Sequence, residues 1–471
     1  MTRRVKLVCT VGPATGSRER VRELLDAGTD VARVNFSHGT PEDHARAVAL
    51  VREAERTCGR DVAVMADLPG PKIRLGELPS EGLRLRPGDR FSLSAESSRK
   101  APSATVSYAG LSNDLRSGDR VLLSDGAVEL VVRGLDGSDV VTEVVRGGTL
   151  RSGAGVNVPA ERLGLPAITP RDREGLSRAL ELGVDLIAQS FVRGAADVIG
   201  LRALMGERQV PIVAKIETRP AAEDVGAILE EADALMVARG DLGVELPMEE
   251  IPVLQKEMLR AARTVGKPAI VATQMLESMI HAPRPTRAEA SDAANAVLDG
   301  ADAIMLSGET AIGEYPIEAA RAAARIAEVA EERAGDFRRI AEPKRHTDEA
   351  AAVAHAAAQV AAGDPAVVAI ACFTRTGRTA ALLSAERPDA PIYAFIADAG
   401  IRRAMALRWG VHSLPAGDPS DTDAMIALMD RGVRDAGLAD EGNSVVMVAS
   451  SPAGKVHTNM LKVHQVGEAA G

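Results

Sequence analysis

IVAKIE, residues 212–217, and ALMVARGD, residues 234–241, are two short apolar runs that each end in charge. The apolar residues suit strands that are buried on both faces, as in a parallel sheet. Burial gives no reason for a charged residue at the end of such a strand, because an uncompensated charge is costly to bury. Lys215, Glu217 and Asp241 are therefore candidates for chemistry, and we expect the two strands to bring them to one rim.

Six further apolar runs of this kind occur in the chain. Apart from one long gap, the eight runs follow one another at intervals close to the ~30 residues of a strand-and-helix unit in an eightfold barrel. The stretches between them look helical; one helix is predicted to follow Thr40 as its cap, with Pro41 in the first turn. The pattern predicts a (β/α)8 TIM barrel, with strands that begin near Val5, Asp30, Val62, Val184, Pro211, Asp233, Pro268 and Ala301.

The long gap, roughly 71–165, differs in character from the rest of the barrel sequence. Its apolar and polar residues alternate, with Gly, Asp and Ser between the alternating runs, which is typical of an all-β insertion. Beyond the eighth run, strand-like segments alternate again with helical ones, which indicates a doubly wound α/β domain. We expect a TIM-barrel catalytic domain at 1–70 and 166–337, a β-barrel cap domain at 71–165 and a C-terminal α/β regulatory domain at 345–471.

Composition limits the classes of partner. The chain of 471 residues carries a net charge of −10 and has no run rich in Lys or Arg, so nucleic acid and anionic membranes are not expected to bind. Aromatic residues make up only 2%, which excludes stacking platforms as a main recognition device. The three cysteines, Cys9, Cys58 and Cys372, lack metal-type spacing, and the N-terminus has no apolar signal core. These features predict a cytoplasmic protein.

Polar residues follow every strand of the predicted barrel, at the end where active sites of this fold lie. Glu217 and Asp241 offer hard oxygen ligands, and two carboxylates leave positions on a Mg²⁺ or Mn²⁺ ion open for substrate or water. Lys215 points to the same face as Glu217, because the two residues are two apart on a strand. Three arginines add forked donors for phosphate or carboxylate: Arg33, Arg74 and Arg239.

Together these charges imply a small anionic substrate and chemistry that develops negative charge. The alternative is a set of surface salt bridges, the usual fate of Lys and Glu pairs. Salt bridges, however, have no reason to gather at one end of buried strands.

Longer motifs surround these residues, namely RVNFSHG, GPKIR, KIET, ARGDLGVE, ATQMLESM followed by PRPTRAE, and DGADAIMLSGETAIGEYP. In this order they resemble the bacterial members of the pyruvate kinase family, and the resemblance runs from residue 5 into the C-terminal domain. It implies transfer of a phosphoryl group from phosphoenolpyruvate to ADP, which gives pyruvate and ATP in the last step of glycolysis. It also implies a mobile cap, activation by a phosphorylated metabolite and a homotetramer.

The resemblance assigns roles to single residues. Glu217 and Asp241 match the family's divalent-metal carboxylates, and Lys215 matches the lysine that stabilises the transferring phosphoryl group and the enolate. Thr273 matches the threonine beside the enolate's methylene carbon, either as the proton donor or as the residue that orients a donor water. Backbone amides around Gly240 and Asp241 are implied to receive the substrate carboxylate.

The same resemblance covers the nucleotide and a monovalent cation. Arg33 and Arg74 match arginines that face nucleotide and phosphate, with Arg33 also among the catalytic residues. Asn35 and His38 are implied to lie beside the ADP; for His38 the alternative is a loop or cap histidine. Members of the family commonly hold K⁺ through positions that match Asn35, Ser37, Asp67 and the backbone carbonyl of Leu68.

Lys72 departs from this common pattern, which has a glutamate at the position. With Leu68, Pro69 and Leu75 around it, Lys72 resembles the K⁺-independent branch of the family. A tethered ammonium can supply the charge of the ion without its binding equilibrium. We therefore expect K⁺ to be dispensable; the alternative is a lysine that is merely solvated.

FTRTGRTA, residues 373–380, lies between a predicted strand and a predicted helix of the third domain. Such a turn can form a phosphate nest at a helix N-terminus, and it resembles the family's effector pocket. The alternative is a well-capped turn with an exposed arginine. The identity of the effector is left open, with a monophosphorylated sugar and AMP as candidates, and the implied binding residues are Thr374, Thr376, Gly377, Arg378 and Thr379.

Two other functions compete with phosphoryl transfer. A metal-dependent lyase or aldolase that forms a pyruvate enolate would share the metal pair but would need neither nucleotide arginines nor a β cap. A silent metabolite sensor would be expected to lose Lys215, Glu217 or Asp241, and all three are present. Arg239 is open as well: it either contacts substrate or fixes the loop geometry around Gly240.

Overall fold

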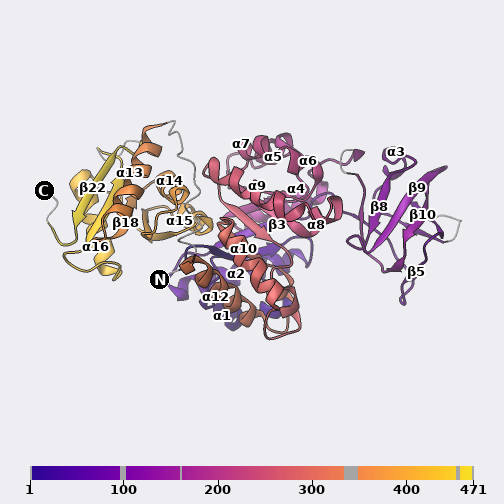
Figure 1. The fold of residues 1–471 in the computed structure, drawn as a ribbon, viewed down its shortest axis with the longest axis horizontal. Coiled ribbons are helices and arrows are strands. Elements are labelled where there is room, and N and C mark those ends of the chain that lie inside the picture. Colours follow the sequence, from indigo (N-terminus) through magenta and orange to yellow (C-terminus); the bar gives the residue numbers. More distant parts are fainter. Residues whose placement is uncertain (1–2, 96–101, 160–161, 334–347, 452–456, 469–471) are drawn as a thin grey trace.

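A computed structural model of the chain describes residues 3–95, 102–159, 162–333, 348–451 and 457–468. Figure 1 shows three bodies in a row, with the C-terminal domain and the cap at opposite ends of a central barrel. The predicted combination of a (β/α)8 barrel, an all-β insertion and a C-terminal α/β domain is confirmed. In these ranges no helix is both long and apolar enough to cross a membrane.

Eight parallel strands close the barrel in the order β1-β17-β16-β15-β14-β13-β3-β2. All their residues except Asn35 are buried, as expected for strands covered on both faces. Each strand begins within two residues of its predicted start. They are β1 (Lys6–Thr10), β2 (Val31–Asn35), β3 (Ala63–Leu68), β13 (Leu186–Gln189), β14 (Ile212–Ile216), β15 (Ala234–Ala238), β16 (Ala269–Ala272) and β17 (Ala303–Leu306).

Helices cover the outside of the barrel and begin where the sequence predicts caps. At the start of α2 (Pro41–Cys58), the Thr40 side chain accepts a hydrogen bond from the Asp43 amide, and Pro41 occupies the first turn. The other helices of this domain are η1 (Pro13–Thr15), α1 (Arg18–Asp26), α4 (Pro170–Glu181), α5 (Ala195–Leu204), α6 (Arg219–Glu223), α7 (Val225–Glu231), α8 (Arg239–Glu245), α9 (Ile251–Thr264), η3 (Glu277–Ile280), α10 (Arg287–Leu298), α11 (Gly308–Ala311) and α12 (Pro316–Arg333).

The cap leaves the barrel after β3 and returns before α4. Its seven-stranded sheet has the order β4-β12-β8-β9-β10-β6-β7, and an antiparallel bridge between Leu75 and Val106 joins the two edges, so that the sheet curls around its own apolar core. A two-stranded sheet of β5 and β11 lies beside it. The elements are β4 (Ile73–Arg74), β5 (Leu83–Leu85), β6 (Arg90–Ser94), β7 (Ser103–Thr105), α3 (Leu111–Asp114), β8 (Arg120–Leu123), β9 (Val128–Asp136), β10 (Asp139–Arg146), β11 (Gly148–Leu150) and β12 (Gly155–Asn157).

The C-terminal domain has a five-stranded sheet in the order β20-β19-β18-β21-β22, in which only the β21–β22 pair is antiparallel. Helices α13 and α14 pack on one face and α16 on the other, which is the predicted doubly wound arrangement. The elements are α13 (Glu349–Gly363), β18 (Val367–Phe373), α14 (Arg378–Glu386), β19 (Ile392–Ile396), α15 (Ala399–Ala404), η5 (Met405–Leu407), β20 (Val411–Pro415), α16 (Thr422–Asp435), β21 (Ser444–Ala449) and β22 (Met460–Gln465).

This domain closes the amino end of the barrel. Leu407 of η5 is 2% exposed and belongs to the same apolar cluster as the residues that fill the barrel interior, such as Met65 and Met236. Ion pairs flank the contact: Arg402 Nε lies 2.9 Å from Asp61, and Arg403 Nε lies 2.8 Å from Asp185. The carboxyl end of the barrel therefore remains the open end, on the side of the cap (Figure 1).

Candidate active site at the carboxyl end of the barrel

Lys215 is the centre of a buried polar network. Its Nζ lies 2.6 Å from Ser190 Oγ, 2.9 Å from Glu217 Oε1 and 3.1 Å from Asp67 Oδ1. Strands β14, β13 and β3 are neighbours in the barrel, so their carboxyl ends bring these groups together from distant parts of the chain. Lys215 is 9% exposed, and its three acceptors fix the position of the ammonium.

Charge keeps Lys215 protonated. Burial alone would lower its pKa, but the adjacent carboxylates of Asp67 and Glu217 outweigh burial and raise the pKa above its usual value. Burial acts to raise the pKa of Asp67, but Lys215 and Arg33 prevail and hold it below its usual value. The site therefore presents a permanent positive charge in a low-dielectric setting.

Arg33 extends the network toward the first strand. Its Nε donates to Asp67 Oδ2 at 2.7 Å and its Nη1 donates to Thr10 Oγ1 at 2.9 Å. Because Asp67 accepts from both Arg33 and Lys215, one buried carboxylate holds two cations side by side. Two adjacent, fixed positive charges form a platform for a multiply charged anion.

Glu217 and Asp241 provide the predicted pair of carboxylates. Glu217 is 2% exposed, and its Oε2 accepts a hydrogen bond of 2.7 Å from the Phe191 amide. Burial and the nearby Asp241 charge raise the pKa of Glu217, although Lys215 acts against them. A divalent cation would relieve this repulsion, and hard oxygens are the ligands that Mg²⁺ prefers. Among the residues that the structure describes, no group of three or more metal-ligating side chains occurs, so such an ion would need further ligands from substrate or water.

Thr273 follows β16 in a strained segment. Its φ is 70° and that of Gln274 is 54°, backbone angles that residues other than glycine rarely adopt. Thr273 Oγ1 accepts from the Gly240 amide at 2.8 Å and donates to the Ala272 carbonyl at 2.6 Å. The Gly240 amide is thus already hydrogen-bonded, which the sequence did not indicate.

Arg239 contacts the protein at several points. Its guanidinium donates to the Thr273 carbonyl at 2.9 Å and to Asp292 at 2.8 Å. Of the two roles considered for Arg239, these contacts favour fixing the loop that carries Gly240 and Thr273.

A cavity of about 800 Å³ opens beside Arg33 and Thr273, and His38 and Asn35 line it as well. Helix α2 contributes a mixed wall, with Asp43, His44 and Arg46 beside the apolar Ala47 and Leu50. His38 lies at the exposed rim; partial burial, and then the charges of Arg74 and Arg33, lower its pKa. The arginine charges that lower this pKa also favour an anionic ligand there.

Two of the oxygen ligands predicted for K⁺, those of Asn35 and Asp67, already accept hydrogen bonds from the protein. Asn35 Oδ1 accepts a hydrogen bond from the Ser37 amide at 3.0 Å, while both carboxylate oxygens of Asp67 face Arg33 and Lys215. Leu68 ends β3 directly beyond Asp67. Lys72 Nζ forms its close ion pair, 2.9 Å, with Asp241.

Lys72 and Arg74 belong to the segment that enters the cap. Lys72 Nζ also lies 4.0 Å from Asp125 in a cap turn, so the lysine lies between barrel and cap. Arg74 donates to the Gly153 carbonyl within the cap at 3.1 Å. The reach of Arg74 toward substrate thus depends on where the cap stands.

The predicted effector turn forms the start of α14. Gly377 caps the helix with φ 81°, and its amide donates to Thr374 Oγ1 at 3.1 Å. The Thr376 hydroxyl accepts from the Arg378 amide at 3.4 Å, and the Arg378 guanidinium pairs with Asp348 at 2.6 Å. A further hydrogen bond of 2.7 Å joins the buried hydroxyls of Thr379 and Thr458.

Ser190, Phe191 and Thr10 are residues of the network to which sequence reasoning assigned no role. Ser190 and Phe191 directly follow β13, and Thr10 ends β1. The signal was available, because polar residues at the carboxyl ends of barrel strands are candidates by position alone. For Phe191 that signal fails, since its contribution is a backbone amide.

The fold and the charged residues at the carboxyl end of the barrel place the chain in a class of protein, the TIM-barrel enzymes with an inserted cap and a C-terminal α/β domain. The family described as "Pyruvate kinase, barrel domain" matches residues 2–320, and "Pyruvate kinase, alpha/beta domain" matches residues 351–464. The chain is 45% identical to a pyruvate kinase of Mycobacterium tuberculosis (strain CDC 1551 / Oshkosh), with 99% of each chain covered. It is 41% identical to a pyruvate kinase of Geobacillus stearothermophilus, covering 99% of this chain and 81% of the relative. The chain belongs to the pyruvate kinase family and is a phosphotransferase.

Proposed function

We propose that the chain transfers the phosphoryl group of phosphoenolpyruvate to ADP at the carboxyl end of the barrel. The supporting observation is the buried network in which Asp67 holds Arg33 and Lys215 side by side, next to a cavity of about 800 Å³. That volume suits a nucleotide, and the two cations suit a phosphate. Phosphoryl transfer needs positioning and charge stabilisation more than covalent chemistry, and this network offers both.

Lys215 and Arg33 bind the transferring phosphoryl group. Because three oxygens fix the Lys215 ammonium, it needs no reorganisation when negative charge develops on the phosphoryl group and on the enolate oxygen. Asp67 and Ser190 act through Lys215 and orient it. Asn35, His38 and Arg74 bind the nucleotide at the rim.

Glu217 and Asp241 would hold Mg²⁺ or Mn²⁺. When bound, the ion supplies charge neutralisation to the phosphate and carboxylate of the substrate. The protein's own part is to orient the ligands: the Phe191 amide and Lys215 each hold one oxygen of Glu217. The backbone around Gly240 and Asp241 receives the substrate carboxylate, and because the Gly240 amide already donates to Thr273, the Asp241 amide is the donor of the two that we assign to it.

Thr273 serves the proton step. Its hydroxyl proton is directed to the Ala272 carbonyl, and one lone pair accepts from Gly240. The remaining lone pair is suited to orient a water that delivers a proton to the methylene carbon of the enolate. This favours the water-orienting role over direct donation.

Lys72 takes the place of K⁺. The ammonium at the root of the cap adds a fixed positive charge beside the proposed substrate site, so activity does not require the ion. Lys72→Glu is expected to make the enzyme K⁺-requiring, measured as kcat in Tris buffer with and without KCl. A wild type that is inactive in K⁺-free buffer contradicts this part of the proposal.

The remaining assignments rest on the family resemblance. Residues 1–70 and 166–337 form the catalytic domain, 71–165 the β-barrel cap and 345–471 the regulatory domain. A phosphorylated metabolite binds the turn at 374–379 and activates the enzyme. The protein works as a homotetramer in the cytoplasm.

The test is a coupled assay for pyruvate formed from phosphoenolpyruvate, with Mg²⁺, with and without ADP, and in buffers with and without KCl. ADP-dependent pyruvate is expected in both buffers; none in the presence of both Mg²⁺ and KCl excludes the proposal. ADP-independent release of pyruvate from other substrates would favour the lyase alternative. Repeating phosphoenolpyruvate saturation with a sugar monophosphate or AMP tests activation, which is expected to lower the KM.

A further inference from the structure

Phe191 lies where the cap joins the barrel and has an unusual backbone. Its φ is 54°, in the left-handed region that a bulky residue adopts only where its surroundings hold it there. Such outliers cluster at functional sites, so the contacts that hold Phe191 are informative.

On its backbone side, Phe191 faces the active site. The amide donates to Glu217 Oε2 at 2.7 Å, and the preceding Ser190 hydroxyl lies 2.6 Å from Lys215 Nζ. Two consecutive residues therefore hold both members of the Lys215–Glu217 pair. The left-handed turn at Phe191 directs its amide to the carboxylate while the ring points elsewhere.

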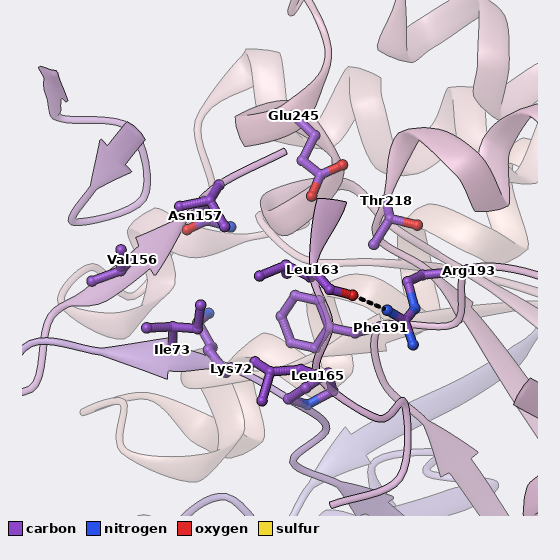
Figure 2. A pocket seen from close by; sticks show the side chains of 12 residues that line it. Lys72, Ile73, Val156, Asn157, Leu163, Leu165, Phe191, Arg193, Thr218 and Glu245 are labelled. Atoms are coloured by element: carbon purple, nitrogen blue, oxygen red, sulfur yellow. Dashed lines mark hydrogen bonds between the residues drawn. The ribbon is translucent and has the colours of Figure 1, made fainter. Parts of the chain in front are cut away.

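On its side-chain side, Phe191 faces the hinge of the cap. Figure 2 shows the ring beside Leu163 and Leu165 of the returning segment, with Lys72 and Ile73 of the outgoing segment to one side. The returning segment is anchored to the same loop, because Arg193 donates to the Leu163 carbonyl at 3.0 Å (Figure 2). Both connections between cap and barrel thus meet at this ring.

The packing leaves the ring little freedom. A Cβ added at Gly70, just before the outgoing segment, would lie 2.9 Å from a ring carbon of Phe191. The Lys72 ammonium lies 6.0 Å from the ring centroid. The remaining cavity is about 30 Å³, which has room for a water or two. The partly buried ring therefore contacts the hinge on one side, while its own backbone carries the amide on the other.

We propose that Phe191 is a positioning residue that couples the position of the cap to the orientation of Glu217. Cap closure and formation of the divalent-metal site then favour each other, because both depend on one side chain. By reciprocity, metal bound at Glu217 must stabilise the hinge as much as hinge closure strengthens metal binding. The inference rests on the proposed metal role of Glu217.

The test uses the full-length enzyme without substrates. Phe191→Gly removes the ring but tolerates the same backbone conformation, so the amide can still reach Glu217. Phe191→Leu keeps apolar bulk without the ring. Phe91→Leu is the matched control, since Phe91 is a fully buried ring in the cap core. Mn²⁺ affinity is measured by electron paramagnetic resonance, and hydrogen exchange is followed in segments 71–75 and 155–158 with and without saturating Mn²⁺.

In the wild type, Mn²⁺ is expected to slow exchange in both segments. In Phe191→Gly, the Kd for Mn²⁺ should rise about tenfold, and saturating Mn²⁺ should no longer slow exchange at the hinge. Phe191→Leu should fall between these results, while Phe91→Leu lowers the Tm with both readouts unchanged. An Mn²⁺ affinity within twofold of wild type and an unchanged hinge response in Phe191→Gly overturn the proposal, as does an equal loss in the control.

Failure of the underlying metal assignment would look different. In that case the Glu217→Gln variant would bind Mn²⁺ as tightly as the wild type does. That result concerns Glu217 itself and is independent of the comparison between Phe191 variants and the Phe91 control.

Discussion

The two ends of the barrel both bury charge, yet they do so in different ways. At the carboxyl end, Lys215 is held by side chains from neighbouring strands of the same rim. At the amino end, Lys6 is 4% exposed and donates to the Val411 carbonyl at 2.7 Å, and Arg387 pairs with Asp302 at 2.9 Å. The partners at the amino end belong to another domain.

Cavity size does not separate the two ends. A cavity of about 680 Å³ lies between the amino end and the C-terminal domain, against about 800 Å³ at the carboxyl end. Backbone strain is denser at the carboxyl end: Phe191, Thr273 and Gln274, with positive φ, all follow strands there, whereas at the amino end Arg387 has a φ of 54° as the C-cap of a helix. Buried charge alone is thus weak evidence for an active site, whereas charge with strained backbone around it is stronger evidence.

The largest expected effect is at the carboxyl end. Glu217→Gln keeps the shape and the acceptor for the Phe191 amide but removes the charge that a metal needs, so kcat should fall about 10³-fold. The variant relieves the repulsion between Glu217 and Asp241 but takes one of two carboxylates from the buried Lys215 ammonium, so the free energy of unfolding should fall by about 2 kcal/mol. Steady-state kinetics with saturating Mg²⁺ and urea unfolding measure the two. Activity within tenfold of wild type would remove Glu217 from the proposed site.

The reverse pattern is expected at the amino end. Leu407→Ala opens a cavity at the base of the barrel interior and should lower the free energy of unfolding by about 3 kcal/mol. The kcat of the folded enzyme should stay within twofold of wild type. Leu204→Ala, at a half-exposed leucine of α5, is the control and should change stability by about 0.5 kcal/mol or less. A kcat loss without destabilisation would contradict the comparison.

Acid should weaken the amino end. Burial, and then the nearby Lys6 charge, lower the pKa of His412 to about 3. In the unfolded chain the His412 imidazole has a pKa near 6.5, so between pH 6.5 and 3 it binds a proton that the folded protein does not bind. The contribution of neutral His412 to the free energy of unfolding is therefore complete above pH 6.5 and is lost as the pH falls toward 3. Between pH 7 and 5 the wild type should lose about 2 kcal/mol more than His412→Gln. Urea unfolding at both pH values measures this; equal losses would refute it.

The smallest expected effect concerns the orientation of Lys215. Ser190→Ala removes one of three acceptors of the ammonium, and Asp67 and Glu217 remain. We expect kcat to fall about tenfold with the KM for ADP unchanged. Ser177→Ala, an exposed serine on α4, is the matched control and should leave kcat unchanged. An unchanged kcat in Ser190→Ala would mean that the two carboxylates alone hold the lysine.

Much of the fold and of the rim could be predicted from local sequence. Doubly buried strands leave apolar runs, and a polar residue at the end of such a run has few reasons to be there other than the site, which predicts Lys215 and Glu217. Asp67 is assigned only by the family resemblance, and to a cation site rather than to the Lys215 network. Cap residues are equally local, and Thr40 marked the start of α2 correctly.

The rest depends on contacts between distant segments. The Lys72–Asp241 pair joins residues 169 positions apart through the fold of the hinge, and no local pattern marks it. The left-handed φ of Phe191 leaves no trace in composition, because the neighbours impose it. The use of the Gly240 amide by Thr273 likewise arises only when the ends of β15 and β16 lie side by side.

Leu407 has a consequence for how the protein is made. The last barrel strand ends at Leu306, but the side chain that closes the barrel interior is synthesised only after half of the C-terminal domain. A ribosome that has completed all eight strands therefore carries a barrel whose inner apolar layer is still open to water at its base. Chains truncated after α12 should be prone to aggregate for the same reason, so the C-terminal domain serves as a late folding partner of the barrel whatever it binds.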